Sequence, residues 1–300
     1  MKRRIRVLGG GAWGLALAQV ARDAGHDVAV WSRKAPDARL ATDAEAVIVA
    51  VPAQAVRQVL EAVPLPKLAA VIISAKGIER GSGAFMHEVV RAVAPGHPAL
   101  MLSGPSFAAD VLAGKPTAVT MAAPDLAQAN AWARDLSRPH FRIYGSDDIT
   151  GVAIGGAMKN VLAIACGISD GRNLGDSARA ALVTRSFAEL SRFGRALGAR
   201  PDTLMGLSGL GDLLLTSTSP QSRNYSAGYR IGRGATAAAA VSATTGTVEG
   251  AYTAQVAVDL ARRHGIDMPI VAAVHAILDQ GSSPEDEINR LLARPLKSET

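Results

Sequence analysis

The 300-residue sequence predicts an α/β N-terminal domain with a doubly wound parallel sheet, followed by an all-helical C-terminal domain. In the first half, short runs of β-branched and aliphatic residues alternate with helical stretches, which is typical of parallel strands joined by right-handed crossovers. From about Asp147 these runs disappear and long segments with helical spacing follow. We therefore expect two domains, residues 1–146 and residues 147–300.

In the first half, strands are expected at residues 5–8, 27–31, 47–51, 71–74, 100–102 and 117–121. Helices are expected at residues 13–24, 54–62 and 82–93. Roughly fifteen residues separate the second strand from the third, which is too few for a helix, a strand and a second helix. The domain is therefore expected to be shortened after Lys34.

In the second half, helices are expected at residues 149–168, 178–197, 251–264 and 270–278, with an alanine-rich helix at 235–243. Alanine and glycine are abundant and aromatic residues reach only 4%, so we expect close helix contacts through small side chains. Such an apolar domain would suit a homodimer interface and equally a monomer core.

The formal net charge of +6 is spread along the chain, and the densest basic run is only Lys2–Arg6. No aromatic residues interleave with it as they do in single-strand binders, so a nucleic-acid partner is not expected. A phosphate-bearing small molecule fits the charge better.

The single cysteine, Cys166, excludes an intramolecular disulfide and a cysteine-based zinc cluster, and the six histidines lack metal-ligand spacing. We therefore assign no metal and expect a reducing cytoplasm. The basic start followed by an apolar run resembles a signal peptide, but Gly9–Gly11 would break that run. Lys159 and Asn160 interrupt the best candidate for a membrane span.

Gly9, Gly11 and Gly14 form a G-x-G-x-x-G turn between the first strand and the first helix. In Rossmann-type domains these glycines permit a tight turn, close approach of a pyrophosphate, and packing of the helix on the sheet. The pyrophosphate lies at the positive N-terminus of the helix. The context predicts a dinucleotide, and hence a nicotinamide-dependent oxidoreductase.

The second strand ends at Trp31 and is followed by Ser32, Arg33 and Lys34, where an acidic residue would favour NAD. Two cations and a hydroxyl could hold a 2′-phosphate, which favours NADP. The alternative is that they are solvated loop charges.

Two polar segments follow buried strands, at the edge where ligands bind in this fold. Lys76 follows the expected strand at residues 71–74 and would point toward a ligand, unless it is a surface lysine. The segment 103–108, with the sequence SGPSFA, could offer hydroxyl and backbone N–H groups to a phosphate or a carbonyl, or it could simply reverse the chain.

Lys159 lies within a long apolar helix, one turn after Gly155 and Gly156. A lysine there either extends to solvent or is buried with a lowered pKa, in which case it can act as an acid or a base. We favour the functional interpretation. The glycines would let another backbone or a ligand come close.

The glycine-rich segment 206–211 predicts a helix-breaking bend that exposes Asp212. Arg223, between Ser222 and Asn224, is a candidate phosphate ligand, although a lone arginine is usually a surface charge.

With these motifs assembled, the chain resembles bacterial NAD(P)-dependent glycerol-3-phosphate dehydrogenases. The blocks GGGAWG, AKG, SGPSFA, GAMKN, GLGDL, SRN and TVEGAYTA occur in the family's order along nearly the whole chain. The resemblance implies reversible reduction of dihydroxyacetone phosphate to sn-glycerol 3-phosphate, which feeds glycerophospholipid synthesis.

The resemblance also implies a role for individual residues. Lys159 matches the general acid/base and Asp212 its polar partner. The positions that match substrate contacts are Lys76, Gly104, Ser106, Lys159, Asp212, Ser222, Arg223 and Asn224. The positions that match the NAD or NADP site are Gly9, Gly11, Ala12, Trp13, Gly14, Arg33, Lys76, Ala108, Arg223, Thr247 and Glu249.

Two departures from the family concern the cofactor. Ala12 stands where Ser or Thr is common, and the stretch after Lys34 is shortened. Two other functions stay open: a related dehydrogenase acting on another acid, such as a 2-dehydropantoate reductase, and a non-catalytic regulator that senses NADP.

Overall fold

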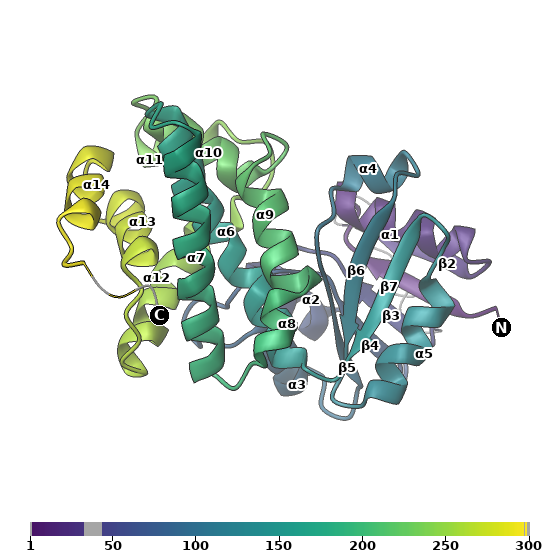
Figure 1. Ribbon diagram of the computed structural model, residues 1–300. Helices are drawn as coiled ribbons and strands as arrows, with labels where there is room; N and C mark the ends of the chain where they lie inside the picture. Colours follow the sequence, from purple (N-terminus) through teal and green to yellow (C-terminus); the bar gives the residue numbers. More distant parts are fainter. Residues whose placement is uncertain (1, 33–43, 297, 299–300) are drawn as a thin grey trace.

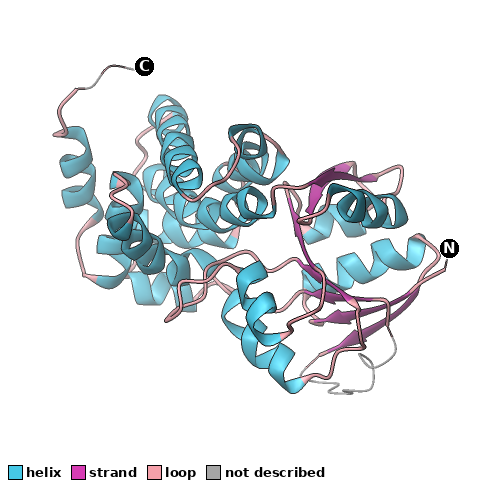
Figure 2. Ribbon diagram, turned by 90° about the horizontal axis from the view of Figure 1, so that it is seen from below, coloured by secondary structure: helices cyan, strands magenta, loops and turns pink. Residues whose placement is uncertain are grey.

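The computed structural model describes residues 2–32, 44–296 and 298. The sheet with its covering helices forms one half of the molecule and a bundle of helices forms the other, with the N-terminus on the sheet half (Figure 1). The same division is visible from below, where the strands gather on one side (Figure 2). The last strand ends at Ser146, and the first helix of the bundle begins at Ile149.

The described strands form one sheet in the order β2-β1-β3-β4-β5-β6-β7. Their bounds are β1 Arg4–Leu8, β2 Asp27–Trp31, β3 Ala46–Val49, β4 Ala70–Ile73, β5 Ala99–Ser103, β6 Thr117–Ala122 and β7 Phe141–Ser146. Strands β1 to β5 run parallel, as predicted. The chain crosses from β2 over β1 to β3, so the order of strands reverses beside β1, where ligands bind in such sheets.

The sheet departs from the predicted parallel arrangement at one pair, because β6 runs antiparallel to β5. The connection between them contains only α4 (Ala108–Leu112), a helix about 7.5 Å long. Such a helix is too short to return the chain along a strand of about 20 Å, whereas an antiparallel neighbour needs only a reversal. Strand β7 was not predicted from the sequence, because its exposed face carries Arg142 and Tyr144 at the edge of the sheet.

Helices cover both faces of the sheet, as expected for a doubly wound domain. One face packs against α1 (Ala12–Asp23) and α5 (Leu126–Leu136). The other packs against α2 (Val56–Ala62), α3 (Met86–Val93) and the long helix α6 of the bundle. This second cluster is continuous with the core of the helical half, so the two halves share apolar packing.

Helix α6 (Ile149–Gly171) is the centre of the helical half. It is long and apolar enough to cross a membrane by composition alone, but its most apolar 18-residue window is entirely buried inside the protein. Around it lie α7 Asp176–Ala196, α8 Pro201–Met205, α9 Asp212–Ser217, α10 Arg223–Gly232, α11 Ala237–Ser242, α12 Glu249–Arg263, α13 Pro269–Asp279 and α14 Pro284–Leu292. Helices α4, α5, α8, α9, α10 and α14 were not predicted from the sequence.

Helices α6 and α10 touch through glycines, as the abundance of small residues predicted. A Cβ added at Gly167 would overlap the backbone of Tyr225, and one added at Gly228 would overlap the carbonyl oxygen of Ile164. The two backbones are therefore in direct contact, which places the first residues of α10 beside the middle of α6.

We expect Gly228→Ala to lower the free energy of unfolding by about 1–3 kcal/mol, because the methyl group meets backbone on a packed helix. Denaturant unfolding followed by circular dichroism measures this change. Gly211→Ala is the control, because its added methyl would find its nearest neighbours at 3.6 Å. A Gly228→Ala variant as stable as this control would contradict the close packing of α6 and α10.

Candidate functional site

Predicted site residues of the first half, together with a turn that was not predicted to belong to the site, follow the carboxyl ends of four parallel strands. The glycine-rich turn follows β1, a turn containing Ala53 follows β3, Lys76 follows β4, and Gly104 follows β5. Because carboxyl ends of parallel strands share one edge of a sheet, the fold gathers these segments where α/β domains bind ligands.

The glycine-rich turn has the geometry that the sequence predicted. Gly9 has φ +129°, and a Cβ there would lie 2.6 Å from the carbonyl oxygen of Ala50 at the end of β3. A Cβ at Gly14 would overlap the carbonyl oxygen of Gly9. At Gly11 an added Cβ would meet nothing within 4 Å, so this face of the turn is open.

The start of α1 fits a dinucleotide pyrophosphate. Its N-cap is Gly11, which supplies no side-chain hydrogen bond, and the first turn contains no acidic residue. The first backbone N–H groups and the helix dipole are therefore free to bind an anion. Trp13 and Ala108 pack against the same apolar cluster beneath this turn. Ser32 contacts Gly10, whereas the predicted Arg33 lies outside the described residues.

Two lysines from different halves of the molecule share one carboxylate. Lys159 Nζ, on α6, donates to Asp212 Oδ1 at 2.6 Å and to Thr216 Oγ1 at 2.9 Å. Lys76 Nζ donates to Asp212 Oδ2 at 2.5 Å and to the carbonyl oxygen of Gly104 at 3.0 Å. Each lysine ammonium carries three N–H donors, and two of them form the bonds just described. The third N–H of each ammonium has no acceptor among the described residues.

The prediction that the bend exposes Asp212 is wrong, because this side chain is fully buried. The glycine-rich segment Leu207–Gly211 does interrupt regular helix, as one π-helical turn that runs directly into α9. The turn directs Asp212 inward, where the two ammonium groups neutralise its charge. Gly155 and Gly156 make room for this arrangement, since a Cβ at Gly155 would overlap the backbone of Ser208.

The environment lowers the pKa of Lys159 to about 8. Burial has the largest effect because it disfavours the charged ammonium; Asp212 opposes it, and the positive charges of Lys76 and Arg223 add to it. The same two lysines hold the pKa of the Asp212 carboxyl below its usual value, despite the opposing effect of its own burial. A lysine with this pKa is populated in both protonation states near neutral pH.

The SRN segment forms the start of α10, next to Lys159. Ser222 is the N-cap and accepts a hydrogen bond from the backbone N–H of Tyr225, so its hydroxyl has a structural role here. Asn224 is buried, donates to Asn160 Oδ1 at 2.9 Å and accepts from the backbone N–H of Gly250 at 2.9 Å. Arg223 is exposed and lies against Gly246.

Glu249 joins the two halves at the start of α12. Its Oε1 accepts from the backbone N–H of Ala53 at 3.1 Å, and its Oε2 is buried without a hydrogen-bond partner among the described residues. Burial raises the pKa of the Glu249 carboxyl, while the Ala53 N–H and the charge of Arg223 oppose the rise. Thr247 is half-buried and lies in the turn that precedes α12.

Two residues of this cluster were missed by reasoning from the sequence. Thr216 lies four residues after Asp212 on α9, and this helical spacing could have placed both on one face. Asn160 donates to the carbonyl oxygen of Lys76 at 3.2 Å, and the signal was a second polar residue inside an apolar helix. Among the residues that the structure describes, Ser106 bonds to the carbonyl oxygen of Gly104 alone, at 3.3 Å.

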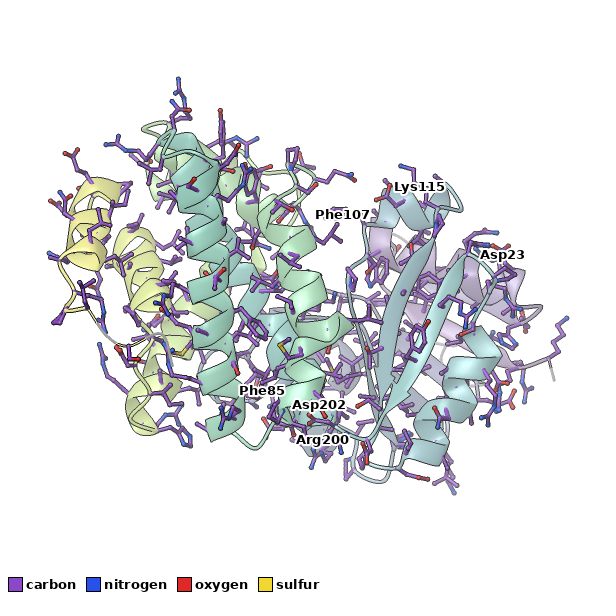
Figure 3. The ribbon with its side chains drawn as sticks, viewed as in Figure 1. Asp23, Phe85, Phe107, Lys115, Arg200 and Asp202 are labelled. Atoms are coloured by element: carbon purple, nitrogen blue, oxygen red, sulfur yellow. The ribbon has the colours of Figure 1, made fainter. Side chains whose placement is uncertain are left out.

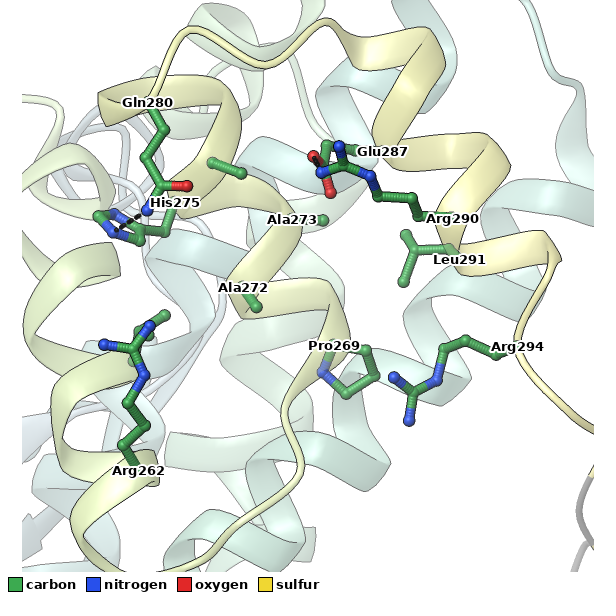
Figure 4. A pocket seen from close by; sticks show the side chains of 12 residues that line it. Arg262, Pro269, Ala272, Ala273, His275, Gln280, Glu287, Arg290, Leu291 and Arg294 are labelled. Carbon is green, nitrogen blue, oxygen red and sulfur yellow. Dashed lines mark hydrogen bonds and ion pairs between the residues drawn. The ribbon is translucent and has the colours of Figure 1, made fainter.

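The boundary between the two halves is marked by Phe107 at one end and by Arg200 and Asp202 at the other (Figure 3). A cavity of about 290 Å³ elsewhere, between α12, α13 and α14, is lined by three arginines, Glu287, other polar side chains and apolar residues (Figure 4). None of its lining residues belongs to the cluster of Lys76, Lys159, Asp212 and Thr216, which we call the lysine–aspartate cluster. Among residues 2–32 and 44–296 we find no group of three or more His, Cys, Asp or Glu side chains that could hold a metal.

Comparison with known proteins identifies the family. The model of the NAD-dependent glycerol-3-phosphate dehydrogenase C-terminus matches residues 148–289, and that of the N-terminus matches residues 4–42 and 36–129. The chain belongs to the glycerol-3-phosphate dehydrogenase family. The two ranges matched by the N-terminal model overlap at residues 36–42.

Relatives of this dehydrogenase family match over the full length. A glycerol-3-phosphate dehydrogenase [NAD(P)+] of Methylobacterium radiotolerans is 52% identical, covering 99% of this chain and 98% of its own. That of Rhodospirillum rubrum is 48% identical, covering 98% and 93%. The crystal structure of glycerol-3-phosphate dehydrogenase from Coxiella burnetii superposes with a TM-score of 0.93 at 35% identity, covering 98% of this chain and 99% of that one.

Proposed function

We propose that this protein catalyses the reversible reduction of dihydroxyacetone phosphate to sn-glycerol 3-phosphate, with NADH or NADPH as the hydride donor. The observation that carries the proposal is that Lys76 and Lys159 both bind the buried Asp212 carboxylate, at the carboxyl edge of the sheet. Family membership favours this substrate over the other small acids that similar folds reduce.

Lys159 is the proton donor in this proposal. Its remaining N–H is directed by the fixed bonds to Asp212 and Thr216, so the proton can pass from Nζ to the ketone oxygen. The bound cofactor supplies the hydride. Lys76 and Lys159 together stabilise the negative charge that develops on that oxygen, in a site from which burial excludes water. In the reverse direction, neutral Lys159 Nζ accepts the proton.

Arg223 and the N-terminus of α10 would bind the substrate phosphate. Arg223 is exposed at the first position of the helix, where the guanidinium and the helix dipole both favour an anion. Asn224 has both ends of its amide bonded within the protein, so we assign it mainly to holding this helix on α6.

The cofactor would lie along the glycine-rich turn, with its nicotinamide end toward the start of α12. Gly11 and the N-terminus of α1 would hold the pyrophosphate. The remaining residues proposed for this site are Gly9, Ala12, Trp13, Gly14, Arg33, Lys76, Ala108, Arg223, Thr247 and Glu249.

The test is the loss of nicotinamide absorbance when the purified protein is mixed with NADPH and dihydroxyacetone phosphate, and again with NADH. We expect turnover with this ketone and none with 2-dehydropantoate. Turnover only with the carboxylate substrate would overturn the proposal in favour of that reaction, and binding of NADPH without any turnover would favour a regulator.

The pH dependence should differ between the two directions, because Lys159 must start protonated for reduction and neutral for oxidation. With a pKa of about 8, kcat/KM for dihydroxyacetone phosphate should fall as pH rises through about 8. kcat/KM for sn-glycerol 3-phosphate should rise over the same interval. Initial rates between pH 6 and pH 10 measure both, and identical profiles in the two directions would exclude Lys159 as the group that titrates.

The proposal also covers the two domains, the cellular location and the use of the product. We assign the cofactor and catalytic domains to residues 1–146 and 147–300, the protein to the cytoplasm, and its product to glycerophospholipid synthesis. A homodimer through the helical half is compatible with these assignments.

A further inference from the structure

The turn after β3 contacts both Glu249 of the helical half and the loop that follows Lys76. This turn, Ala53–Ala55, precedes α2. The backbone N–H of Ala53 donates to Glu249 on α12. The next residue, Gln54, uses both ends of its side-chain amide: Nε2 donates to the carbonyl oxygen of Ile78 at 2.8 Å, and Oε1 accepts from the backbone N–H of Arg80 at 3.0 Å.

Ile78 and Arg80 belong to the loop that carries Lys76. The loop folds back on itself through a bridge between Ile78 and Phe85 and a bond from the Glu79 N–H to the carbonyl oxygen of Ala84. Lys76 lies two residues before the point that Gln54 holds. The amide of Gln54 therefore fixes the base of this loop, from which the Lys76 side chain extends to Asp212.

Gly77, which lies between Lys76 and Ile78, packs tightly against the turn Ala53–Ala55. A Cβ at Gly77 would lie 2.7 Å from Cβ of Ala53 and 3.6 Å from Oε2 of Glu249. The backbone after Lys76 is thus pressed against the turn that Glu249 contacts. A small shift of the loop would therefore both move Lys76 and disturb the contact between this turn and Glu249.

The far side of the loop is held by the helical half. Arg80 donates to the carbonyl oxygen of Ala251 at 3.2 Å, and its guanidinium lies 4.8 Å from the ring centre of Tyr252 on α12. On the sheet side, Arg57 forms two bonds to the Glu79 carboxylate at 2.8 and 2.9 Å. These contacts hold the tip of the loop, whereas Gln54 holds its base.

We propose that Gln54 is a positioning residue, whose amide clamps the Lys76 loop to the turn that contacts Glu249 and so keeps Lys76 on Asp212. The inference rests on the proposed function, in which Lys76 acts at the ketone oxygen. Gln54 itself touches neither reacting group. Its effect on the reaction passes through Lys76.

The test compares Gln54→Met with Gln58→Met. Methionine keeps the length of the side chain and removes both polar atoms. Gln58 is an exposed glutamine on α2 without a hydrogen bond to the described residues, which makes it a matched control. Hydrogen exchange of the peptide covering residues 76–85 measures the clamp without any substrate. We expect exchange of this peptide to become roughly tenfold faster in Gln54→Met, because the Arg80 N–H loses its acceptor, and to stay unchanged in Gln58→Met.

A double-mutant cycle with Lys76→Ala then measures the positioning role. We expect Gln54→Met to lower kcat/KM for dihydroxyacetone phosphate about tenfold in the wild-type background, because a small misplacement of a catalytic group is costly. In the Lys76→Ala background the same change should cost less than twofold.

The outcomes separate the inference from the proposed function. Unchanged exchange in Gln54→Met would overturn the clamp whatever the substrate is. Faster exchange with additive kinetic losses would overturn the positioning role while leaving the proposed function in place. A wild-type protein without activity toward dihydroxyacetone phosphate would overturn the proposed function, and the role of Gln54 in that reaction with it.

Discussion

Lys159→Met is expected to lower kcat for reduction of dihydroxyacetone phosphate by about a hundredfold or more, because the proposed proton donor is removed while the helix that carries it is kept. Methionine has a similar length and is apolar, so it suits the buried interior of α6. Steady-state kinetics with NADPH measure the loss. Cofactor binding, followed by quenching of protein fluorescence, should remain close to that of the wild type.

The control for this variant is Lys67→Met. Lys67 is exposed on the sheet half and lies outside the lysine–aspartate cluster, so the change should leave kcat within about twofold. A Lys159→Met enzyme with near-normal turnover would show that another group donates the proton.

Asp212→Asn is expected to reduce both stability and activity. The change leaves the buried ammonium of Lys159 and that of Lys76 without their shared counter-charge, and breaking such a pair typically costs about 3–5 kcal/mol. Because Asp212 opposes the effect of burial on Lys159, its loss should lower the pKa of Lys159 further below 8. At neutral pH, less of the lysine would then carry the proton needed for reduction.

Two measurements check this expectation. Denaturant unfolding should show the loss of stability, and the fall of kcat/KM for reduction should begin at lower pH than in the wild type. Asp176→Asn serves as the control, because this carboxylate is 91% exposed and its pair with Arg179 should contribute little. An Asp212→Asn enzyme with unchanged stability and pH profile would contradict the shared ion pair.

Local patterns were sufficient to predict much of the fold. The second strand was predicted with the bounds that the structure has, and α6, α7, α12 and α13 were found to within three residues of their ends. These elements have strong apolar periodicity and clear boundaries. The helices α8 to α10 are short or partly polar, and they are stabilised by contacts with α6 that are distant in sequence. Strand β7 is stabilised by pairing with β6 and by packing against the apolar cluster that contains α5.

The candidate site was predictable as a set of residues but not as an arrangement. Lys76, Lys159 and Asp212 were each chosen from their local context or the family resemblance. No local pattern indicated that both lysines bind the same carboxylate, because the three residues come from a loop after β4, the middle of α6 and the start of α9. For the same reason the burial of Asp212 was predicted incorrectly.

Local sequence patterns were enough to predict the dinucleotide-binding turn, the parallel strands β1 to β5 and the helical second half, because each depends on residues close together in the chain. The reversed direction of β6, the shared ion pair on Asp212 and the bonds from Gln54 to the Lys76 loop became visible only in the three-dimensional structure. These features depend on where separate segments meet, and that is set by packing of the two halves around α6 rather than by any local preference.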